Sequence, residues 1–310
     1  MPTVRLELTD ISGSVYSSVD CFSFYFEKES YTPYTSLNGT FYLNTAVANP
    51  KEVSFYIDEK KVHYGIIDTI DFCVGLSGKL MVKLKSKGFT SMLTQNQLEP
   101  GLKANVSLNS LMDSFINIPN VTHEDNSNTQ NYIYVKKNSS MWDSIANLSY
   151  KLMGTYPYIE GTNTVRISPK ANPKNVSLNN EKMLSYGIIN DYTKIISDYH
   201  MQDINGDYSI YNLSNPAAYS RNIIRHKHID LDRQYLYSPQ DALVYKIAHS
   251  MRGFFSYYGE YQGYSGEDLS DTLTISGIIT NARINRIEIS GNAKGITTKC
   301  YTYFDSFFNQ

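Results

Sequence analysis

The sequence predicts a mainly β protein in which two small antiparallel β-barrel domains flank a small α/β domain. Three observations support this fold class. Polar and apolar residues alternate through residues 1–88 and again after residue 169, as in half-buried strands. Between these regions the apolar residues follow the spacing of helices. The 310 residues include 27 Tyr and 13 Phe, and both side chains favour strands and large contacts.

Residues 1–88 form the first predicted β-barrel domain. Three runs place apolar residues at every second position: Val4, Leu6 and Leu8; Phe22, Phe24 and Phe26; and Val53, Phe55 and Ile57. Residues 61–88 then predict a long strand, a turn at Gly75–Gly78 and a second strand. The residues of that strand expected to point inward are Leu80, Val82 and Leu84.

Residues 89–168 form the predicted α/β insert. Ser107 can cap a helix whose expected buried face holds Leu108, Leu111, Met112 and Phe115. A strand at 132–135 follows. Ser140 and Asp143 then predict the start of a second helix. Its expected apolar face consists of Trp142, Ile145, Ala146, Leu148, Leu152 and Met153.

Residues 169–310 form the second predicted β-barrel domain, which carries one helix at about 239–253. Ser238 is a suitable N-cap, and Pro239 suits the first helical position because it lacks a backbone N–H. Asp241 places a negative charge in the first turn, where the helix dipole favours it. The remaining segments alternate as strands do.

The composition excludes several classes of function. The 28 Lys and Arg balance 30 Asp and Glu, so no strong field attracts nucleic acid or an anionic membrane. No apolar stretch approaches the roughly 18 residues that span a bilayer, and the N-terminus lacks the pattern of a signal peptide. Codon usage of an AT-rich genome would also raise the Tyr content, so composition alone does not decide the function.

Neither the three cysteines nor any known catalytic motif indicates an enzyme. Cys21, Cys73 and Cys300 are odd in number and far apart, so we expect three reduced thiols. The motifs HExxH, GxSxG, GxxxxGK[ST], GxGxxG and CxxC are absent. Glycosidases remain open, because their two carboxylates need no sequence motif.

Two polar segments resemble metal sites. His226 and His228 share one face of a strand, and Asp230 could add a third ligand for a transition metal. An exposed polar face is the favoured interpretation. Asp203–Asp207 resembles a calcium loop, but its glycine stands at the fourth position and not at the sixth. A hairpin turn explains that segment better.

Two further features have a functional and a structural interpretation. Trp142, the single Trp, could form an aromatic platform for sugar, as in LysM-like carbohydrate-binding modules. Packing in the helix core is the more frequent role of such a residue. The outward lysines at 79, 83, 85 and 87 could steer an acidic partner, or they could simply solvate a strand and discourage edge pairing.

Five segments, by their order and spacing, resemble the hub protein of contractile phage tails and phage-tail-like bacteriocins, the late-control-D-like hub family. The first two segments are Tyr64–Asp68 and Gly88–Gln97 (GFTSMLTQNQ), and the third is Ser139–Gly154 (SSMWDSIANLSYKLMG). The last two are Leu231–Met251 (LDRQYLYSPQDALVYKIAHSM) and Gly277–Gly291 (GIITNARINRIEISG). The resemblance covers most of the chain.

The resemblance implies a homotrimer of tail-tube-like barrels that forms a pseudo-hexameric ring. This ring would join the sixfold tail tube protein to the threefold central spike protein. Other baseplate proteins and the tape measure protein are further expected partners, and a specific nucleic acid or membrane insertion is not expected. The protein would then be assembled in the bacterial host cytoplasm and belong to the baseplate of a virion or tail-like particle.

The resemblance also implies details of the chain. Part of residues 169–190 would complete the first barrel. The chain stops at Gln310 without a lytic or spike extension, so we expect the spike and any peptidoglycan hydrolase to be separate chains.

We therefore expect a structural hub that is not an enzyme and has no catalytic, cofactor or metal site. Two alternatives come from other classes of function. One is a carbohydrate- or cell-wall-binding distal tail protein that uses the 89–168 insert and Trp142. The other is a tail-associated lysin component that hydrolyses the cell wall.

Overall fold

The structure, a computed structural model, describes residues 3–75, 78–179, 183–232 and 238–305. Residues 76–77 of the predicted turn, residues 233–237 of the fourth resembling segment and Gln310 at the chain end lie outside these ranges. Within the described ranges, no helix combines the length and the apolar character needed to cross a membrane.

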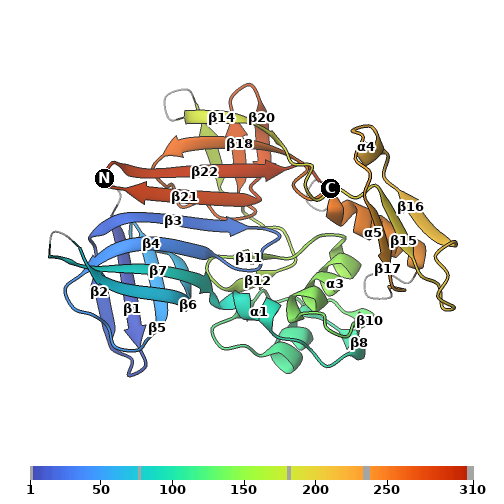
Figure 1. Ribbon diagram of the computed structural model, residues 1–310, viewed down its shortest axis with the longest axis horizontal. Coiled ribbons are helices and arrows are strands. Elements are labelled where there is room, and N and C mark those ends of the chain that lie inside the picture. The colour runs from blue at the N-terminus through green and yellow to red at the C-terminus, as the bar shows by residue number, and fades with distance from the viewer. Residues whose placement is uncertain (1–2, 76–77, 180–182, 233–237, 306–310) are drawn as a thin grey trace.

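Within the described residues, one antiparallel sheet of eleven strands, which we call the main sheet, runs through both β regions (Figure 1). The predicted mainly β fold is therefore confirmed. From one edge to the other the strands are β14 (Met183–Asn190), β18 (Phe255–Gln262), β22 (Gly295–Tyr303), β21 (Arg286–Asn292), β3 (Cys21–Glu29), β4 (Ser36–Leu43), β7 (Leu80–Gly88), β6 (Lys60–Val74), β5 (Pro50–Ile57), β1 (Val4–Asp10) and β2 (Val15–Ser18).

The first seven strands of the chain, β1 to β7, curl into a barrel around an apolar core. Phe24 of β3 and Phe55 of β5 have ring centroids 4.8 Å apart, although three strands separate β3 from β5 in the sheet. Near β2, the last strand of the sheet, the backbone N–H of Tyr42 in β4 donates to the carbonyl of Asp20, which follows β2. The alternation of apolar residues in the sequence produces this curl, because every second side chain faces the same core.

The second β region packs a three-stranded sheet against the other end of the main sheet. That small sheet consists of β13 (Asn175–Leu178), β19 (Thr272–Ile275) and β20 (Ile279–Arg283). The two sheets approach closely at Gly259, where an added Cβ would lie 2.6 Å from the Cδ1 atom of Leu178. The cores of the two β regions form one continuous apolar cluster, because β3 pairs directly with β21.

The insert has its own core of helices and short strands. Its elements are η1 (Phe89–Ser91), α1 (Met92–Gln95), β8 (Gly101–Val106), α2 (Leu108–Ser110), η2 (Leu111–Ile116), β9 (Thr122–His123), β10 (Gln130–Val135), α3 (Met141–Met153), β11 (Tyr158–Glu160) and β12 (Thr164–Arg166). The start of α3 follows the sequence prediction, since Ser140 and Asp143 form a capping box. Gly154 ends α3 with a left-handed backbone, φ 66°, which glycine adopts without strain.

The helix predicted after Ser107 forms, but its buried face differs from the prediction. After α2 the chain continues as the π-helical turn η2, in which the N–H of Asn117 donates to the carbonyl of Met112. Leu108, Leu111 and Met112 are buried as predicted, whereas Phe115 is 43% exposed. The wider π turn rotates later residues away from the face that a 3.6-residue period predicts.

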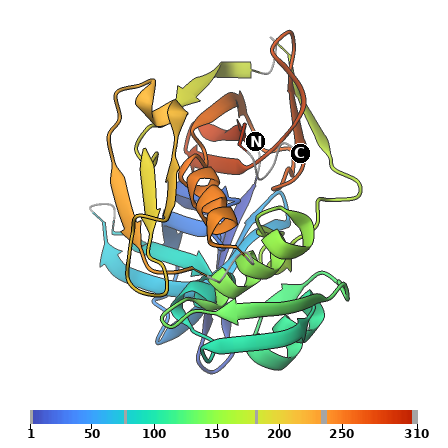
Figure 2. The same ribbon diagram turned by 90° about the vertical axis from the view of Figure 1, so that its right-hand side faces the viewer.

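A small lobe lies between β14 and β18 in the sequence and contains the predicted helix of residues 239–253. It consists of β15 (Asp198–Met201), β16 (Tyr211–Ser214), α4 (Pro216–Tyr219), β17 (His226–Ile229) and α5 (Pro239–Ser250). Met201, Ala242 and Leu243 form its core, so α5 packs against this three-stranded sheet. Figure 2 shows α5 beside α3. Tyr245, on the other side of α5, meets Tyr150 of α3 there, with ring centroids 4.7 Å apart.

A buried ionic cluster fixes the insert and both β regions together. Lys28 of β3 points into the core and forms an ion pair with Asp268 of the second β region. Its ammonium also donates to the carbonyl of Gly161 in the insert, at 2.6 Å. Asp268 in turn accepts a bond from the N–H of Gly161, also at 2.6 Å. Burial alone would raise the pKa of Asp268, but the charges of Lys28 and Lys170, together with hydrogen bonds from Lys28 and Gly161, lower it.

A buried histidine closes the first barrel near the insert. His63 is fully buried, with Nδ1 2.7 Å from the hydroxyl of Thr35 and Nε2 2.7 Å from that of Ser86. The Ser86 hydroxyl donates to the carbonyl of Ile66, so it accepts from Nε2–H, and Nδ1 accepts from Thr35. This network needs a neutral imidazole, and burial lowers the pKa of His63 to about 3.

Lys28→Met should lower the free energy of unfolding by about 3 to 5 kcal/mol, because it leaves the buried carboxylate of Asp268 without its main partner. Urea unfolding followed by far-UV circular dichroism measures this loss. Lys51→Met is the matched control, since Lys51 forms a partly exposed ion pair with Glu52, and it should cost less than about 1 kcal/mol. Equal losses in the two variants would show that the buried cluster does not hold the units together.

Acidification should destabilise the protein through His63, because its pKa is lower in the folded state than the value of 6.5 in the unfolded state. Between pH 6.5 and about 3 the unfolded state binds more protons, so stability falls as pH falls. One such group contributes about 1.4 kcal/mol per pH unit. His63→Gln should therefore flatten the dependence of unfolding free energy on pH below 6.5, and parallel curves for variant and wild type would refute this assignment.

Candidate functional site

The outer face of the main sheet, turned away from the core, carries polar and charged side chains over both β regions. At the junction of β3 and β21, Arg286 forms ion pairs with Glu27 at 2.8 Å and Glu288 at 2.6 Å. Tyr301 of β22 donates its hydroxyl to Glu288 at 2.8 Å. The acidic groups at this junction are therefore engaged by groups of the same chain.

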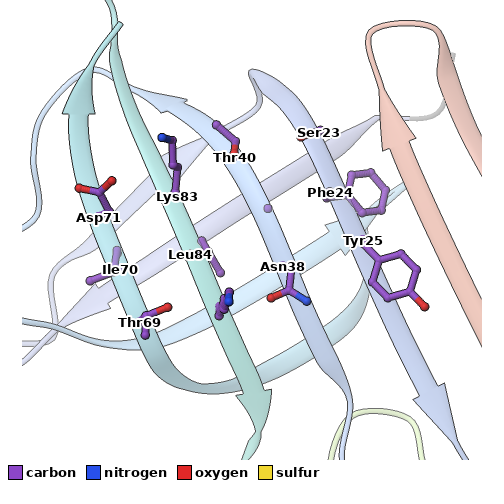
Figure 3. Close-up of a pocket in the computed structure, with 12 residues that line it drawn as sticks. Ser23, Phe24, Tyr25, Asn38, Thr40, Thr69, Ile70, Asp71, Lys83 and Leu84 are labelled. Atoms are coloured by element: carbon purple, nitrogen blue, oxygen red, sulfur yellow. The ribbon is translucent and has the colours of Figure 1, made fainter.

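The same face contains an open hollow over β3, β4, β7 and β6 (Figure 3). The hollow has a volume of about 660 Å³. Its polar lining residues are Ser23, Tyr25, Asn38, Thr40, Thr69, Asp71, Lys83 and Lys85. Of the outward lysines predicted on this strand, Lys83 and Lys85 are exposed and lie in the hollow. The other two are engaged, Lys87 by Asp68 at 3.1 Å and Lys79 over the ring of Tyr42.

One edge of the main sheet is open. Within the part of the chain that the structure describes, β14 pairs with β18 alone, so its other side presents unpaired backbone groups. Leu184, Tyr186 and Ile188 alternate along it and are 56%, 53% and 52% exposed. The strand has no Lys or Pro to discourage pairing, which is unusual for an exposed edge. The sequence predicts a strand here, but nothing in its pattern distinguishes an edge strand from a central one.

At the opposite end of the main sheet, the curl of the barrel brings β2 beside β4, and this region also exposes apolar side chains. Val15 begins β2, Val19 lies in the connection from β2 to β3, and Phe22 is the second residue of β3. Their exposed fractions are 58%, 69% and 58%. Phe22 is held at this position by an edge-on contact with the ring of Tyr42, with centroids 6.5 Å apart. Each end of the main sheet therefore presents an apolar surface to solvent.

The structure does not bring the predicted His226–His228–Asp230 set together as a metal site. Among the described residues no group of three or more His, Cys, Asp or Glu is placed to hold a metal ion. Instead, His226 and His228 share the outer face of the lobe with His200 of β15, whose ring stacks on that of His228 at 4.7 Å. The side chain of His226 is 49% exposed, as on a polar surface.

A hydrogen-bonded carboxylate lies beside these histidines. One oxygen of Asp198 is 3.4 Å from Nδ1 of His226. Burial alone would raise the pKa of Asp198, but hydrogen bonds from Tyr219, Ser197 and Ser214 lower it. Asp198 therefore anchors β16 and α4 to β15.

The Asp203–Asp207 segment is a hairpin turn between β15 and β16, as predicted. One carboxylate oxygen of Asp203 accepts the backbone N–H groups of Asn205, at 2.7 Å, and of Asp207, at 2.8 Å. Gly206 has φ 90°, which glycine adopts without strain. The loop's own amides thus use the carboxylate of Asp203 to close the turn.

Trp142 does not form an exposed platform. Its side chain is 3% exposed and belongs to the core of the insert, where it meets the ring of Tyr156 edge-on. The carbohydrate-binding alternative therefore loses the residue on which it depended. The hydrophobic spacing of α3 explains this position, because Trp142 lies on the same face as Ile145 and Ala146.

Comparisons with known proteins identify the fold. Neither a protein family model nor a curated relative matches the sequence. A tail protein from Neisseria meningitidis MC58 matches with a TM-score of 0.70 and 12% identity, over 99% of this chain and 98% of that one. The 43 kDa tail protein of prophage MuSo2 from Shewanella oneidensis matches with a TM-score of 0.68 and 11% identity, over 97% and 98% of the two chains.

A third similar structure comes from a secretion machine. It is an E. coli protein described as a component of the type VI secretion system with structural similarity to T4 bacteriophage tail proteins. It matches with a TM-score of 0.55 and 8% identity, over 98% of this chain and 78% of that one. All three likenesses extend over almost the whole chain, main sheet, insert and lobe together. The chain has the fold of these two tail proteins, which the type VI secretion component also resembles.

Proposed function

We propose that this protein is a structural hub at the distal end of a phage-type tail. In this proposal three copies form a pseudo-hexameric ring that joins a sixfold tail tube to a threefold central spike. The observation that carries it is the main sheet, which unites two β regions of seven strands each within the described residues. The whole-length likeness to prophage tail proteins supports the same assignment.

The two β regions give the symmetry argument its physical basis. The first region contains β1 to β7, and the second contains β13, β14 and β18 to β22. Three copies of a chain with two such regions present six β regions around one axis. A single polypeptide can then face a sixfold partner with one side and a threefold partner with the other. We propose residues 1–88, 89–168 and 169–310 as the corresponding domains.

The ring contact in this proposal joins the two ends of the main sheet. The β14 edge of one copy would meet the end of the next copy that carries Val15, Val19 and Phe22. Such a contact uses different surfaces on the two partners, so it closes into a ring if the rotation permits. Full burial of an apolar side chain contributes roughly 1.5 to 3 kcal/mol, and several half-exposed ones are available at each end.

The proposed partners and location follow from this role. They are the tail tube protein, the spike protein, other baseplate proteins and the tape measure protein. The protein would reside in the baseplate of a virion or tail-like particle after assembly in the host cytoplasm. We propose no catalytic activity, because the buried ionisable groups Lys28, Asp268 and His63 are engaged in bonds that hold the fold.

The purified protein should form a trimer, with a mass of three times the 35.3 kDa of the chain in light scattering after size exclusion. Leu184→Lys combined with Ile188→Lys should give monomers, because two charges at the apolar edge would be buried without partners. The matched control is Ile204→Lys with Ile210→Lys, which places two charges on exposed residues of the lobe. A wild-type chain that stays monomeric at micromolar concentration would contradict the ring.

The purified chain should release no soluble fragments from peptidoglycan, because we assign it no hydrolytic residues. Turbidity of a peptidoglycan suspension and reducing-end assays measure such release, with lysozyme as the positive control. Release that survives repurification of the chain would favour the lysin alternative over the hub.

A further inference from the structure

We propose that the hollow on the outer face of the first barrel is a docking site for an acidic, extended peptide segment of a partner protein. The hollow spans β3, β4, β7 and β6 (Figure 3). This inference goes beyond the proposed hub function, because the ring contact uses the ends of the main sheet and not this face.

Charge is the first argument for an acidic ligand. Lys83 and Lys85 are exposed, and neither forms an ion pair or hydrogen bond with the residues that the structure describes. Asp71 is the one acidic residue among those that line the hollow. It stands opposite Lys83 in the strand register without forming an ion pair. The lining therefore carries two positive charges and one negative charge, and an incoming carboxylate would neutralise the excess.

The contrast with other cations on this face strengthens the argument. Lys87 is paired with Asp68, and Arg286 is paired with Glu27 and Glu288. Lys61 and Lys299 of the same sheet lie over tyrosine rings. Among the described lysines of the main sheet, Lys83 and Lys85 are therefore the two without an ion pair, a hydrogen bond or a ring contact, and both lie at the hollow. If Lys83 and Lys85 only kept the strand soluble, no hollow would be needed beside them.

The polar lining suits a peptide. Ser23 and Tyr25 lie two residues apart on β3, and Asn38 and Thr40 lie two residues apart on β4. Outward residues at this spacing present hydrogen-bonding groups in regular rows, which can serve the backbone of an extended chain. The volume of about 660 Å³ falls within the range of ligand sites, roughly 300 to 1,000 Å³.

Other anionic ligands fit less well. Nucleic-acid-binding surfaces neutralise several phosphates and stack bases on aromatic rings. Here two lysines are available, and Tyr25 is the one aromatic lining residue that is not buried. A second copy of this chain offers no match at the junction of β3 and β21, since Arg286 already holds Glu27 and Glu288. An acidic segment of a different protein is the ligand that the charges favour.

Fluorescence anisotropy with fluorescein-labelled hexaglutamate and the full chain tests this proposal at low salt. We expect saturable binding that weakens as salt rises. Lys83→Gln with Lys85→Gln should weaken it at least tenfold, because two charge-assisted contacts are lost. Asp71→Asn should tighten it severalfold by removing the one repulsive charge. The matched control, Lys136→Gln with Lys137→Gln, makes the same change in net charge on the insert and should leave the affinity within twofold.

Three outcomes would overturn the proposal. They are no binding of hexaglutamate at low salt, equal weakening in both double variants, and binding of labelled hexathymidylate as tight as that of hexaglutamate. The last would assign the hollow to phosphate polymers. Thermal melting of each variant verifies that it folds. This test is independent of the proposed ring, because a chain that stays monomeric would still bind hexaglutamate.

Discussion

The arrangement of the whole molecule depends on the buried cation of Lys28. Lys28 lies on β3, the strand of the first β region that pairs with β21 of the second. The partners of its ammonium come from the second β region and from the insert. A buried charge is tolerated only where its partners are held in place, because desolvation costs several kcal/mol. Each of the three units is therefore required to complete the environment of one side chain, and this requirement fixes their relative positions.

This constraint gives the surfaces their functional meaning. Because β3 of the first region pairs with β21 of the second, the open β14 edge and β2, near which Val15, Val19 and Phe22 are exposed, are the two ends of one sheet. The hollow with Lys83 and Lys85 lies on the outer face between them. A sheet that is continuous and anchored in this way can hold three separate surfaces at fixed distances, which a structural component with several partners needs.

Much of the fold could be predicted because local patterns agree with it. Alternating apolar residues give the strands of the first barrel, and the Ser140–Asp143 pair gives the start of α3. The differences have identifiable causes. Phe115 is exposed because a π-helical turn changes the period. The polar face favoured for His226 and His228 forms, and a parallel strand pairing that sequence spacing does not encode adds His200 to it.

By itself the sequence determined the strand alternation, the helix caps, the lack of enzyme motifs and the resemblance to tail hubs. These features depend on residues close together in the chain, where backbone geometry sets which side chains share a face. Only the tertiary structure decided that both β regions share one sheet, that β14 forms its open edge, and that Lys83 and Lys85 have no ion pair. Burial, pairing and charge balance depend on residues far apart in sequence, so they arise only when the chain has folded.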